Sequence, residues 1–213
     1  MFHINKLHYI SQATDVITHL DAIKKSLDAG CNWIQLRIKN QTQDLVLEQA
    51  ILAKKLCDSY QAKLIINDNP MVAHAVNAHG VHLGLLDMPI AEARRIVGDQ
   101  LIIGGTANTF DHVKQRASEG ADYVGLGPFR FTNTKQNLSP VLGLTGYQSV
   151  ISKMRDEGIN VPLIAIGGIN AEDVLALMGV GVYGIAISGS ITFAEDSRKV
   201  VETLNDSLNT EFA

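Results

Sequence analysis

The sequence predicts a single α/β domain, a (β/α)8 TIM barrel that spans residues 1–213. Short apolar runs alternate with amphipathic stretches along the whole chain, and eight such pairs can be distinguished. The length of 213 residues also suits one domain near the small end for this fold. Strict alternation requires a parallel sheet with helical crossovers. Eight units favour closure into a barrel over the alternative, an open doubly wound sheet.

The strands are expected where β-forming apolar runs are bounded by turn residues. Their ranges are 7–11, 33–38, 63–67, 80–83, 101–105, 122–126, 162–166 and 182–187. Helices are expected between them at 15–29, 44–60, 71–77, 90–97, 146–157, 170–178 and 194–208, with a further helix after residue 109. In the first helix, Leu20, Ile23 and Leu27 share one face, and Gly30 is a plausible stop.

The helix after Thr109 is predicted from a capping hydroxyl and an apolar face. Thr109 can cap its first turn, and Phe110, Val113 and Ala117 form the expected inner face. Residues 127–145 then interrupt the rhythm of the chain. Loops longer than about 12–15 residues are often active-site lids, and we expect this one to have a function.

Composition excludes several classes of partner. The net charge of −4 and the pI of about 5.9 argue against nucleic acid, although a local basic cluster can still bind small anions. Cys31 and Cys57 match neither zinc-site nor C-x-x-C spacing, which favours a reducing compartment. We find no signal peptide or membrane-spanning run, so a cytoplasmic protein without membrane contact is expected. The sequence is compatible with a monomer and with a homo-oligomer.

Polar residues at the end of the second strand suggest an anion site. Side chains alternate along a strand, so Gln35, Arg37 and Lys39 share one face, opposite Leu36 and Ile38. The polar set is expected to point into the barrel near its mouth, where the functional sites of this fold lie. Buried polar and charged groups require partners, and an anionic ligand is the simplest one. Alternatively, Lys39 is a solvated loop residue and Arg37 pairs with an internal carboxylate.

Two aspartates follow the third and fourth strands. Asp68 and Asp87 would lie close together if these strands are neighbours, about 4.8 Å apart. Mg²⁺ typically takes one or two carboxylates together with phosphate oxygens and water, so the pair is a candidate metal site. Either aspartate could instead cap the helix that follows it.

The remaining strand ends suggest phosphate binding. Thr106 follows the fifth strand and could donate to a phosphate oxygen or cap a turn. Hydroxyls and cations are concentrated in the sixth loop, which reads GPFRFTNTK from residue 127. The seventh and eighth strands end in Gly167-Gly168 and Ser188-Gly189, and these two loops form a recurrent phosphate site in barrels.

Taken together, these short motifs resemble the thiamine phosphate synthase family over nearly the whole chain. The matching stretches are QLRIK at 35–39, IND at 66–68, GVHLG at 80–84 with Asp87, TNTK at 132–135, AIGGI at 165–169, and Ser188-Gly189. The resemblance implies a transferase of thiamine biosynthesis that uses Mg²⁺ and phosphorylated small-molecule substrates. It would join 4-amino-2-methyl-5-(diphosphooxymethyl)pyrimidine to 4-methyl-5-(2-phosphoethyl)thiazole, or its carboxylate, and release pyrophosphate.

The resemblance also implies roles for individual residues. Residues implied for the pyrimidine diphosphate are Gln35, Leu36, Arg37, Ile38, Lys39, Asn67, Thr106 and Lys135. Residues implied for the thiazole phosphate are Thr132, Asn133, Thr134, Gly168, Ser188 and Gly189. Asp68 and Asp87 would bind Mg²⁺. Arg37, Lys39 and Lys135 would act catalytically by stabilising charge on the leaving pyrophosphate.

The chain departs from the family pattern at a few positions. Ile38 stands where the family often has Glu, and Thr106 stands where Ser is usual, which keeps the hydroxyl. Leu85 and Leu86 replace a more polar pair before Asp87, so the chain departs from the family most clearly in the fourth loop.

Two alternatives remain open. The related thiazole tautomerase, by the same resemblance, uses a His just after the strand-six Gly, and Pro128 stands there in this chain. A non-catalytic barrel that binds a phosphorylated ligand is possible on any such fold. A phosphate-binding isomerase or aldolase would need an internal base or Schiff-base Lys, for which there is no clear candidate.

Overall fold

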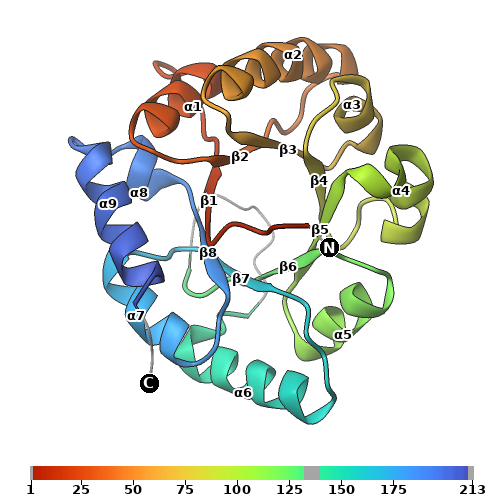
Figure 1. Cartoon of the computed structure of the whole chain (residues 1–213), viewed down its shortest axis with the longest axis vertical. Coiled ribbons are helices and arrows are strands. Elements are labelled where there is room, and N and C mark those ends of the chain that lie inside the picture. The colour runs from red at the N-terminus through yellow and green to blue at the C-terminus, as the bar shows by residue number, and fades with distance from the viewer. Residues whose placement is uncertain (1, 132–139, 211–213) are drawn as a thin grey trace.

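The computed structural model describes residues 2–131 and 140–210, and its strands close into a parallel barrel in the order β1 to β8 (Figure 1). Each strand pairs with its neighbour in sequence, and β1 pairs with β8, as in the register of Tyr9 with Ile187. The predicted (β/α)8 barrel is therefore confirmed, and the open doubly wound sheet is excluded.

The helices form a ring around the barrel (Figure 1). The strands are β1 (Leu7–Ile10), β2 (Trp33–Leu36), β3 (Lys63–Asn67), β4 (Gly80–Leu83), β5 (Ile102–Ala107), β6 (Tyr123–Leu126), β7 (Leu163–Ile166) and β8 (Gly184–Ile187). The helices are α1 (His19–Asp28), α2 (Gln43–Ser59), α3 (Pro70–Ala75), α4 (Ile90–Val97), α5 (Phe110–Ser118), α6 (Gly143–Asp156), α7 (Ala171–Gly179), α8 (Gly189–Thr192) and α9 (Ser197–Leu208). A short 3-10 helix, η1 (Gly98–Gln100), precedes β5.

The first helix starts later than the sequence predicts. It begins at His19 rather than at residue 15, because Thr18 forms a capping box with Asp21. The Thr18 hydroxyl accepts from the Asp21 N–H at 3.1 Å, and the Asp21 carboxylate accepts from the Thr18 N–H at 3.1 Å. Both exchanges satisfy N–H groups that a helix start leaves unpaired, so they fix where α1 begins. The stop at Gly30 is confirmed by its positive φ of 104° just after the C-cap.

The second strand is shorter than predicted, and the closing helix starts three residues later than predicted, at Ser197. Strand β2 ends at Leu36 because the next N–H, that of Arg37, donates to the Ser11 hydroxyl at 3.0 Å. The predicted helix at 194–208 is α9, and the short α8 precedes it. Asp196 separates them, since its side chain accepts from the Lys199 N–H at 3.0 Å and caps α9.

The inner face of α5 differs from its predicted composition. Thr109 caps the helix as expected, accepting from the His112 N–H at 3.2 Å. However, the fully buried positions are Val113 and Arg116, whereas Ala117 is only half-buried. The charged Arg116 is thus buried, next to the alanine that was expected to face the core.

The core consists of two layers on either side of the strands. The larger layer fills the space between the strands and the helices, and the smaller one contains inward-facing residues such as Trp33, Ile65 and Tyr123. Trp33 stacks on His8 with ring centroids 4.0 Å apart and meets Tyr123 edge to face at 5.1 Å. This aromatic group lies in the barrel interior beneath the mouth.

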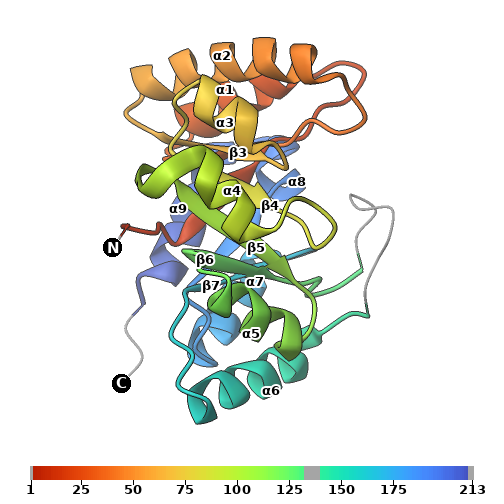
Figure 2. The same cartoon turned by 90° about the vertical axis from the view of Figure 1, so that its right-hand side faces the viewer.

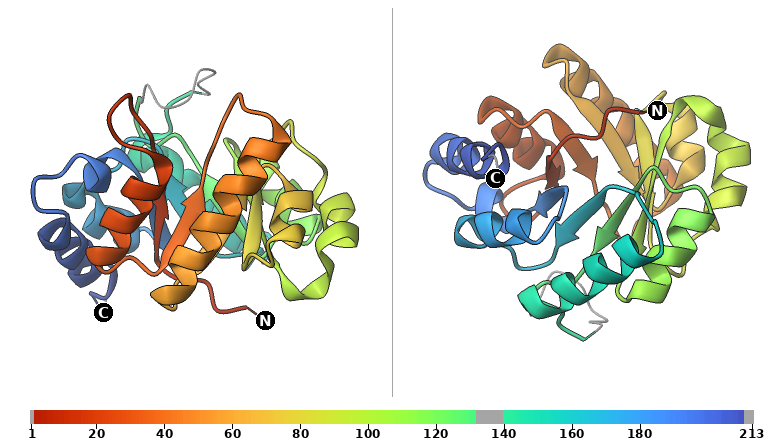
Figure 3. Two further views of the ribbon diagram at one scale, coloured as in Figure 1. Left: turned by 90° about the horizontal axis from the view of Figure 1, so that it is seen from above. Right: turned by 60° about the horizontal axis from the view of Figure 1, so that its bottom comes forward.

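The two ends of the barrel differ in what they carry. The N-terminal residues and the end of α9 lie at one end, and the loops that follow the strands lie at the other (Figures 2 and 3). Within the described part of the chain, no helix is long and apolar enough to cross a membrane.

Candidate active site

The mouth of the barrel gathers the polar residues that end β2 and β3. Gln35 and Asn67 are buried, at 2% and 8% exposure, and the Gln35 amide donates to the Asn67 side-chain oxygen at 3.2 Å. The Asn67 amide nitrogen has no hydrogen-bond partner among the described residues. A buried donor left unpaired is costly, so this amide nitrogen is suited to donate to a ligand.

Arg37 and Lys39 follow β2 and differ in burial. Arg37 lines the cavity at the mouth, and burial lowers the pKa of its guanidinium, while the charge of Asp68 acts in the opposite direction. Lys39 is 44% exposed and forms an ion pair with Asp68. Arg37 therefore lines the cavity and lies within the field of Asp68, whereas Lys39 pairs with that carboxylate and is not among the described residues that line the cavity.

Asp68 and Asp87 lie beside each other, as the neighbouring strands predicted. Burial raises the pKa of Asp68 to about 6, and its hydrogen-bonding contact with Asp87 also raises it, while Lys39 lowers it. Neither aspartate caps a helix. Asn69 caps α3 by accepting from the Val72 N–H at 3.0 Å. The helix start at α4 has no side-chain cap.

The local backbone explains how these two carboxylates come together. Asp68 adopts a left-handed conformation with φ of 64°, so the chain turns sharply where β3 ends. The Asp87 carboxylate reaches back to accept from the Gly84 N–H at 2.6 Å. Two adjacent carboxylates disfavour each other's ionisation unless a cation lies between them. This donor set fits Mg²⁺, which commonly takes two protein carboxylates and completes its shell with phosphate oxygens and water.

Thr106 belongs to β5 and faces the cavity. The structure extends β5 to Ala107, two residues beyond its predicted end. The Thr106 hydroxyl lies 3.0 Å from the His82 Nε2, and the Nδ1 of the same ring lies 3.0 Å from the Tyr123 hydroxyl. Thr106 thus does not cap a turn, and its hydroxyl is held at the wall of the cavity by a buried histidine.

A cavity of about 280 Å³ occupies the mouth. Its described lining includes the predicted residues Arg37, Thr106, Gly168, Ser188 and Gly189, together with apolar and glycine positions of β6 to β8. Gly167 and Gly168 have positive φ values of 96° and 69°, which glycine adopts without strain. Such a backbone can bring N–H groups close to a phosphate.

The sixth and seventh loops are connected by several hydrogen bonds. The Phe129 N–H donates to the Ile166 carbonyl at 2.9 Å, and the Arg130 N–H donates to the Gly167 carbonyl at 3.0 Å. The Arg130 guanidinium donates to the Gly168 carbonyl at 2.7 Å and pairs with Asp173. These contacts fix the conformation of the glycine pair that lines the cavity.

Some residues implied by the resemblance lie elsewhere or outside the described residues. Leu36 and Ile38 pack their side chains into the layer between strands and helices, so only their backbone can meet a ligand. Thr132, Asn133, Thr134 and Lys135 fall outside the described residues.

The cavity also includes residues that the sequence analysis did not assign to it. Asn108 and Asn170 line it, and so does Ser190. Asn108 directly follows β5, so its position after a strand was an available signal. His82, which the sequence analysis includes only within the motif GVHLG, also lines the cavity.

Comparison with known proteins shows the family of this chain. A family model described as thiamine monophosphate synthase matches residues 7–191. A thiamine-phosphate synthase of Flavobacterium johnsoniae is 50% identical over 96% of both chains. One of Flavobacterium psychrophilum is 51% identical over 96% of this chain and 99% of that one. The solved thiamine phosphate pyrophosphorylase from Pyrococcus furiosus has a TM-score of 0.80 at 32% identity and covers 95% of both chains. This chain belongs to the thiamine monophosphate synthase family.

Proposed function

We propose that this chain is a transferase that joins 4-amino-2-methyl-5-(diphosphooxymethyl)pyrimidine to 4-methyl-5-(2-phosphoethyl)thiazole, giving thiamine phosphate and pyrophosphate. Membership of the family supports this activity. The structural observation that carries it is that the two sides of the barrel mouth differ in chemistry. Cations and carboxylates gather at the ends of β2 to β4, and glycine-rich backbone lines the side formed by β7 and β8.

The first half of the mouth is suited to the diphosphate. Arg37 and Lys39 bring positive charge to one side, and Asn67 and Thr106 offer an amide and a hydroxyl. As the carbon–oxygen bond to the pyrimidine methylene breaks, its electron pair leaves on the diphosphate oxygen. Fixed cations next to that oxygen stabilise the developing negative charge, and burial strengthens this stabilisation.

The second half is suited to the monophosphate of the thiazole. Gly168, Ser188 and Gly189 line it with backbone and one hydroxyl. Holding the thiazole there orients the lone pair of its ring nitrogen toward the pyrimidine methylene, where it forms the new carbon–nitrogen bond. Orientation of two bound rings can supply a large part of the rate enhancement. No protein nucleophile is needed for this chemistry.

Asp68 and Asp87 would hold Mg²⁺ next to the diphosphate. The ion would neutralise diphosphate charge and polarise the leaving group. Lys39 forms an ion pair with Asp68, so it places a second cation beside the same carboxylate.

Two alternatives receive less support. The tautomerase reading lacks its expected histidine, because Pro128 stands after the strand-six glycine. That enzyme has no use for a diphosphate site, whereas this chain gathers Arg37, Lys39, Asp68 and Asp87 at one place. A non-catalytic binding barrel would have no need for this arrangement either.

The assay for the proposed function is formation of thiamine phosphate from both substrates and Mg²⁺, followed by fluorescence after oxidation. We expect product from the wild type that depends on Mg²⁺, and about a hundredfold less from Lys39→Met. Lys24→Met, which removes an exposed lysine of α1 paired with Asp28, is the matched control and should stay near wild type. A folded wild type that binds thiazole phosphate but forms no product would contradict the proposal.

The expected surroundings of the enzyme follow from the same reading. We propose a cytoplasmic protein that acts on small phosphorylated molecules, with no nucleic acid or membrane partner. Both cysteines are free and buried, and burial raises the pKa of Cys31 and of Cys57 to about 12, which disfavours thiolate formation. Gel filtration with light scattering would decide between a monomer and a homo-oligomer.

A further inference from the structure

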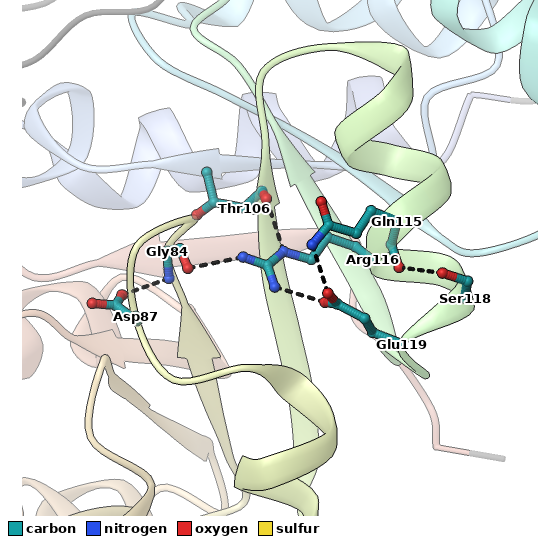
Figure 4. Close-up of polar contacts among 7 residues, drawn as sticks. All are labelled: Gly84, Asp87, Thr106, Gln115, Arg116, Ser118 and Glu119. Atoms are coloured by element: carbon teal, nitrogen blue, oxygen red, sulfur yellow. Dashed lines mark hydrogen bonds and ion pairs between the residues drawn. The ribbon is translucent and has the colours of Figure 1, made fainter.

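Arg116 of α5 is a buried cation whose contacts extend to two strand ends. Its side chain is 3% exposed. Its Nε donates to the Thr106 carbonyl at 3.3 Å, and one terminal nitrogen donates to the Gly84 carbonyl at 2.9 Å. The other terminal nitrogen pairs with Glu119 at 2.7 Å. Figure 4 shows the guanidinium between the ends of β4 and β5, with Glu119 on its far side.

The partners of Arg116 fix its orientation. A buried cation is unfavourable unless it is paired and its donors are satisfied. Glu119 provides the charge, and the Gln115 amide donates to Glu119 at 2.6 Å, which holds the carboxylate in place (Figure 4). The planar guanidinium then presents its remaining donors to two backbone carbonyls at once, which an ammonium group cannot do in the same way.

The strand beside Arg116 leaves room for it. A Cβ added to Gly105 would lie 2.8 Å from the Arg116 Cδ. Any larger residue at 105 would therefore collide with the arginine stem. The glycine and the arginine together allow α5 to come this close to the end of β5.

Both carbonyls that Arg116 holds belong to residues that serve the site. Gly84 accepts from Arg116 through its carbonyl and donates its N–H to the Asp87 carboxylate at 2.6 Å. Thr106 accepts from Arg116 through its carbonyl, and its hydroxyl meets His82 at the cavity wall. The guanidinium thus contacts the backbone of Thr106, a proposed diphosphate ligand, and is linked through Gly84 to Asp87, a proposed Mg²⁺ ligand (Figure 4).

We propose that Arg116 is a positioning residue for the diphosphate half of the reaction. It clamps the ends of β4 and β5, and so holds Asp87 and the Thr106 hydroxyl where Mg²⁺ and the diphosphate bind. It touches neither ligand itself. This inference rests on the proposed function, because it assigns Asp87 and Thr106 to the diphosphate site.

The test replaces Arg116 by Met, which keeps an apolar stem and removes the guanidinium. Calorimetric titration with pyrophosphate in Mg²⁺, without the thiazole, reports on binding independently of activity. We expect pyrophosphate to bind about tenfold to a hundredfold more weakly, as is typical when a group behind a metal ligand is lost. The KM for the pyrimidine diphosphate should rise similarly, while the KM for the thiazole phosphate stays within about twofold.

Arg94→Met is the matched control. Arg94 of α4 also bridges backbone and carboxylate, donating to the Leu101 carbonyl at 2.6 Å and to Asp122 at 2.7 Å. These contacts lie before β5 and β6 begin, at the opposite end of the barrel. This variant should lose stability and keep pyrophosphate binding, which separates positioning from a general structural effect.

Arg116→Lys and added guanidinium make the test robust. Arg116→Lys keeps the charge but can donate to only some of the three acceptors, which are the Gly84 and Thr106 carbonyls and Glu119, so an intermediate pyrophosphate affinity is expected. This variant provides the test if Arg116→Met does not fold. Guanidinium at millimolar concentration should restore part of the affinity of Arg116→Ala. If Arg116→Met binds pyrophosphate within twofold of the wild type, or raises the KM values for both substrates equally, the inference is overturned.

Failure of the inference and failure of the proposed function give different results. If the wild type binds Mg²⁺ and pyrophosphate but makes no thiamine phosphate, the proposed reaction is wrong. The pyrophosphate titrations of the Arg116 variants then still test the positioning role. If the wild type makes thiamine phosphate but does not bind pyrophosphate with Mg²⁺, the positioning role is wrong and the proposed reaction stands.

Discussion

The carboxylate of Asp87 accepts from the N–H of Gly84 and lies against Asp68, so its negative charge is directed at the mouth rather than at a helix start. Sequence alone left a helix-capping role open for both aspartates, because a carboxylate oxygen can either accept a hydrogen bond from a helix start or bind a metal ion. The structure excludes the capping role, since Asn69 takes the capping position after β3 and the start of α4 has no side-chain cap.

Asp87→Asn tests this assignment. The amide oxygen can still accept from the Gly84 N–H, so the free energy of unfolding should change by less than about 1 kcal/mol. The rate should fall about a hundredfold, with a higher Mg²⁺ concentration needed for half-maximal activity. Initial rates over a Mg²⁺ series measure this. Asp99→Asn, at an exposed aspartate of η1, is the control, and an unchanged Mg²⁺ dependence in Asp87→Asn would reject the metal role.

His8 is a second residue with a defined consequence. Complete burial lowers the pKa of His8 well below its ordinary value, and the nearby His82 acts in the same direction. The folded state therefore keeps His8 neutral, while the unfolded chain takes up a proton below about pH 6.5. More protons are then bound by the unfolded state, so the free energy of unfolding falls as the pH falls below about 6.5, by about 1.4 kcal/mol per unit for this residue.

His8→Phe should remove that part of the pH dependence while keeping a ring against Trp33. Urea unfolding at about pH 7 and about pH 5.5 gives the comparison. Between these two values we expect the variant to lose about 1 kcal/mol less stability than the wild type. Equal losses in both proteins would show that His8 takes up its proton in the folded state as well.

Among the elements, α6 contributes one buried hydroxyl that bridges the ends of the paired strands β6 and β7. Tyr147 is fully buried, donates to the Leu126 carbonyl and accepts from the Ile166 N–H at 3.4 Å. It lies directly behind the loops that form the monophosphate half of the mouth. Tyr147→Phe removes the hydroxyl from both of these contacts.

We expect Tyr147→Phe to lower the free energy of unfolding by about 1–2 kcal/mol, measured by urea denaturation. Tyr60→Phe is the control, because the Tyr60 side chain is 40% exposed and its hydroxyl donates to the exposed Asp28. That control should change stability by less than about 0.5 kcal/mol. If both variants have the stability of the wild type, the buried hydroxyl does not hold the two strands.

Element boundaries show what periodicity can and cannot predict. The alternation of strands and helices follows from hydrophobic period, and it is confirmed from β1 to α7. The ends of elements depend on single hydrogen bonds, such as the Arg37 N–H to Ser11 and the capping box at Thr18. Those partners come from other strands or from local side-chain geometry, which a periodic pattern does not contain.

For the whole molecule, closure of the barrel brings together residues that are far apart in sequence. Reading the residue after each strand was enough to find Arg37, Thr106 and Gly168 at the cavity. It did not find Arg116, because that side chain belongs to the last turn of a helix and reaches the strand ends only through the packing of α5 on β5. Residues behind a site are thus harder to predict than residues that line it.

We propose that one mouth holds two anion sites, one for the pyrimidine diphosphate and one for the thiazole phosphate. Steady-state kinetics of Lys39→Met and Ser188→Ala, with each substrate varied in turn, test it most directly. We predict that Lys39→Met raises the KM for the pyrimidine diphosphate by about tenfold or more and leaves that for the thiazole phosphate unchanged, and that Ser188→Ala has the reverse pattern. Equal effects on both KM values in both variants, or no thiamine phosphate from the wild type, would contradict the presence of two separate substrate sites.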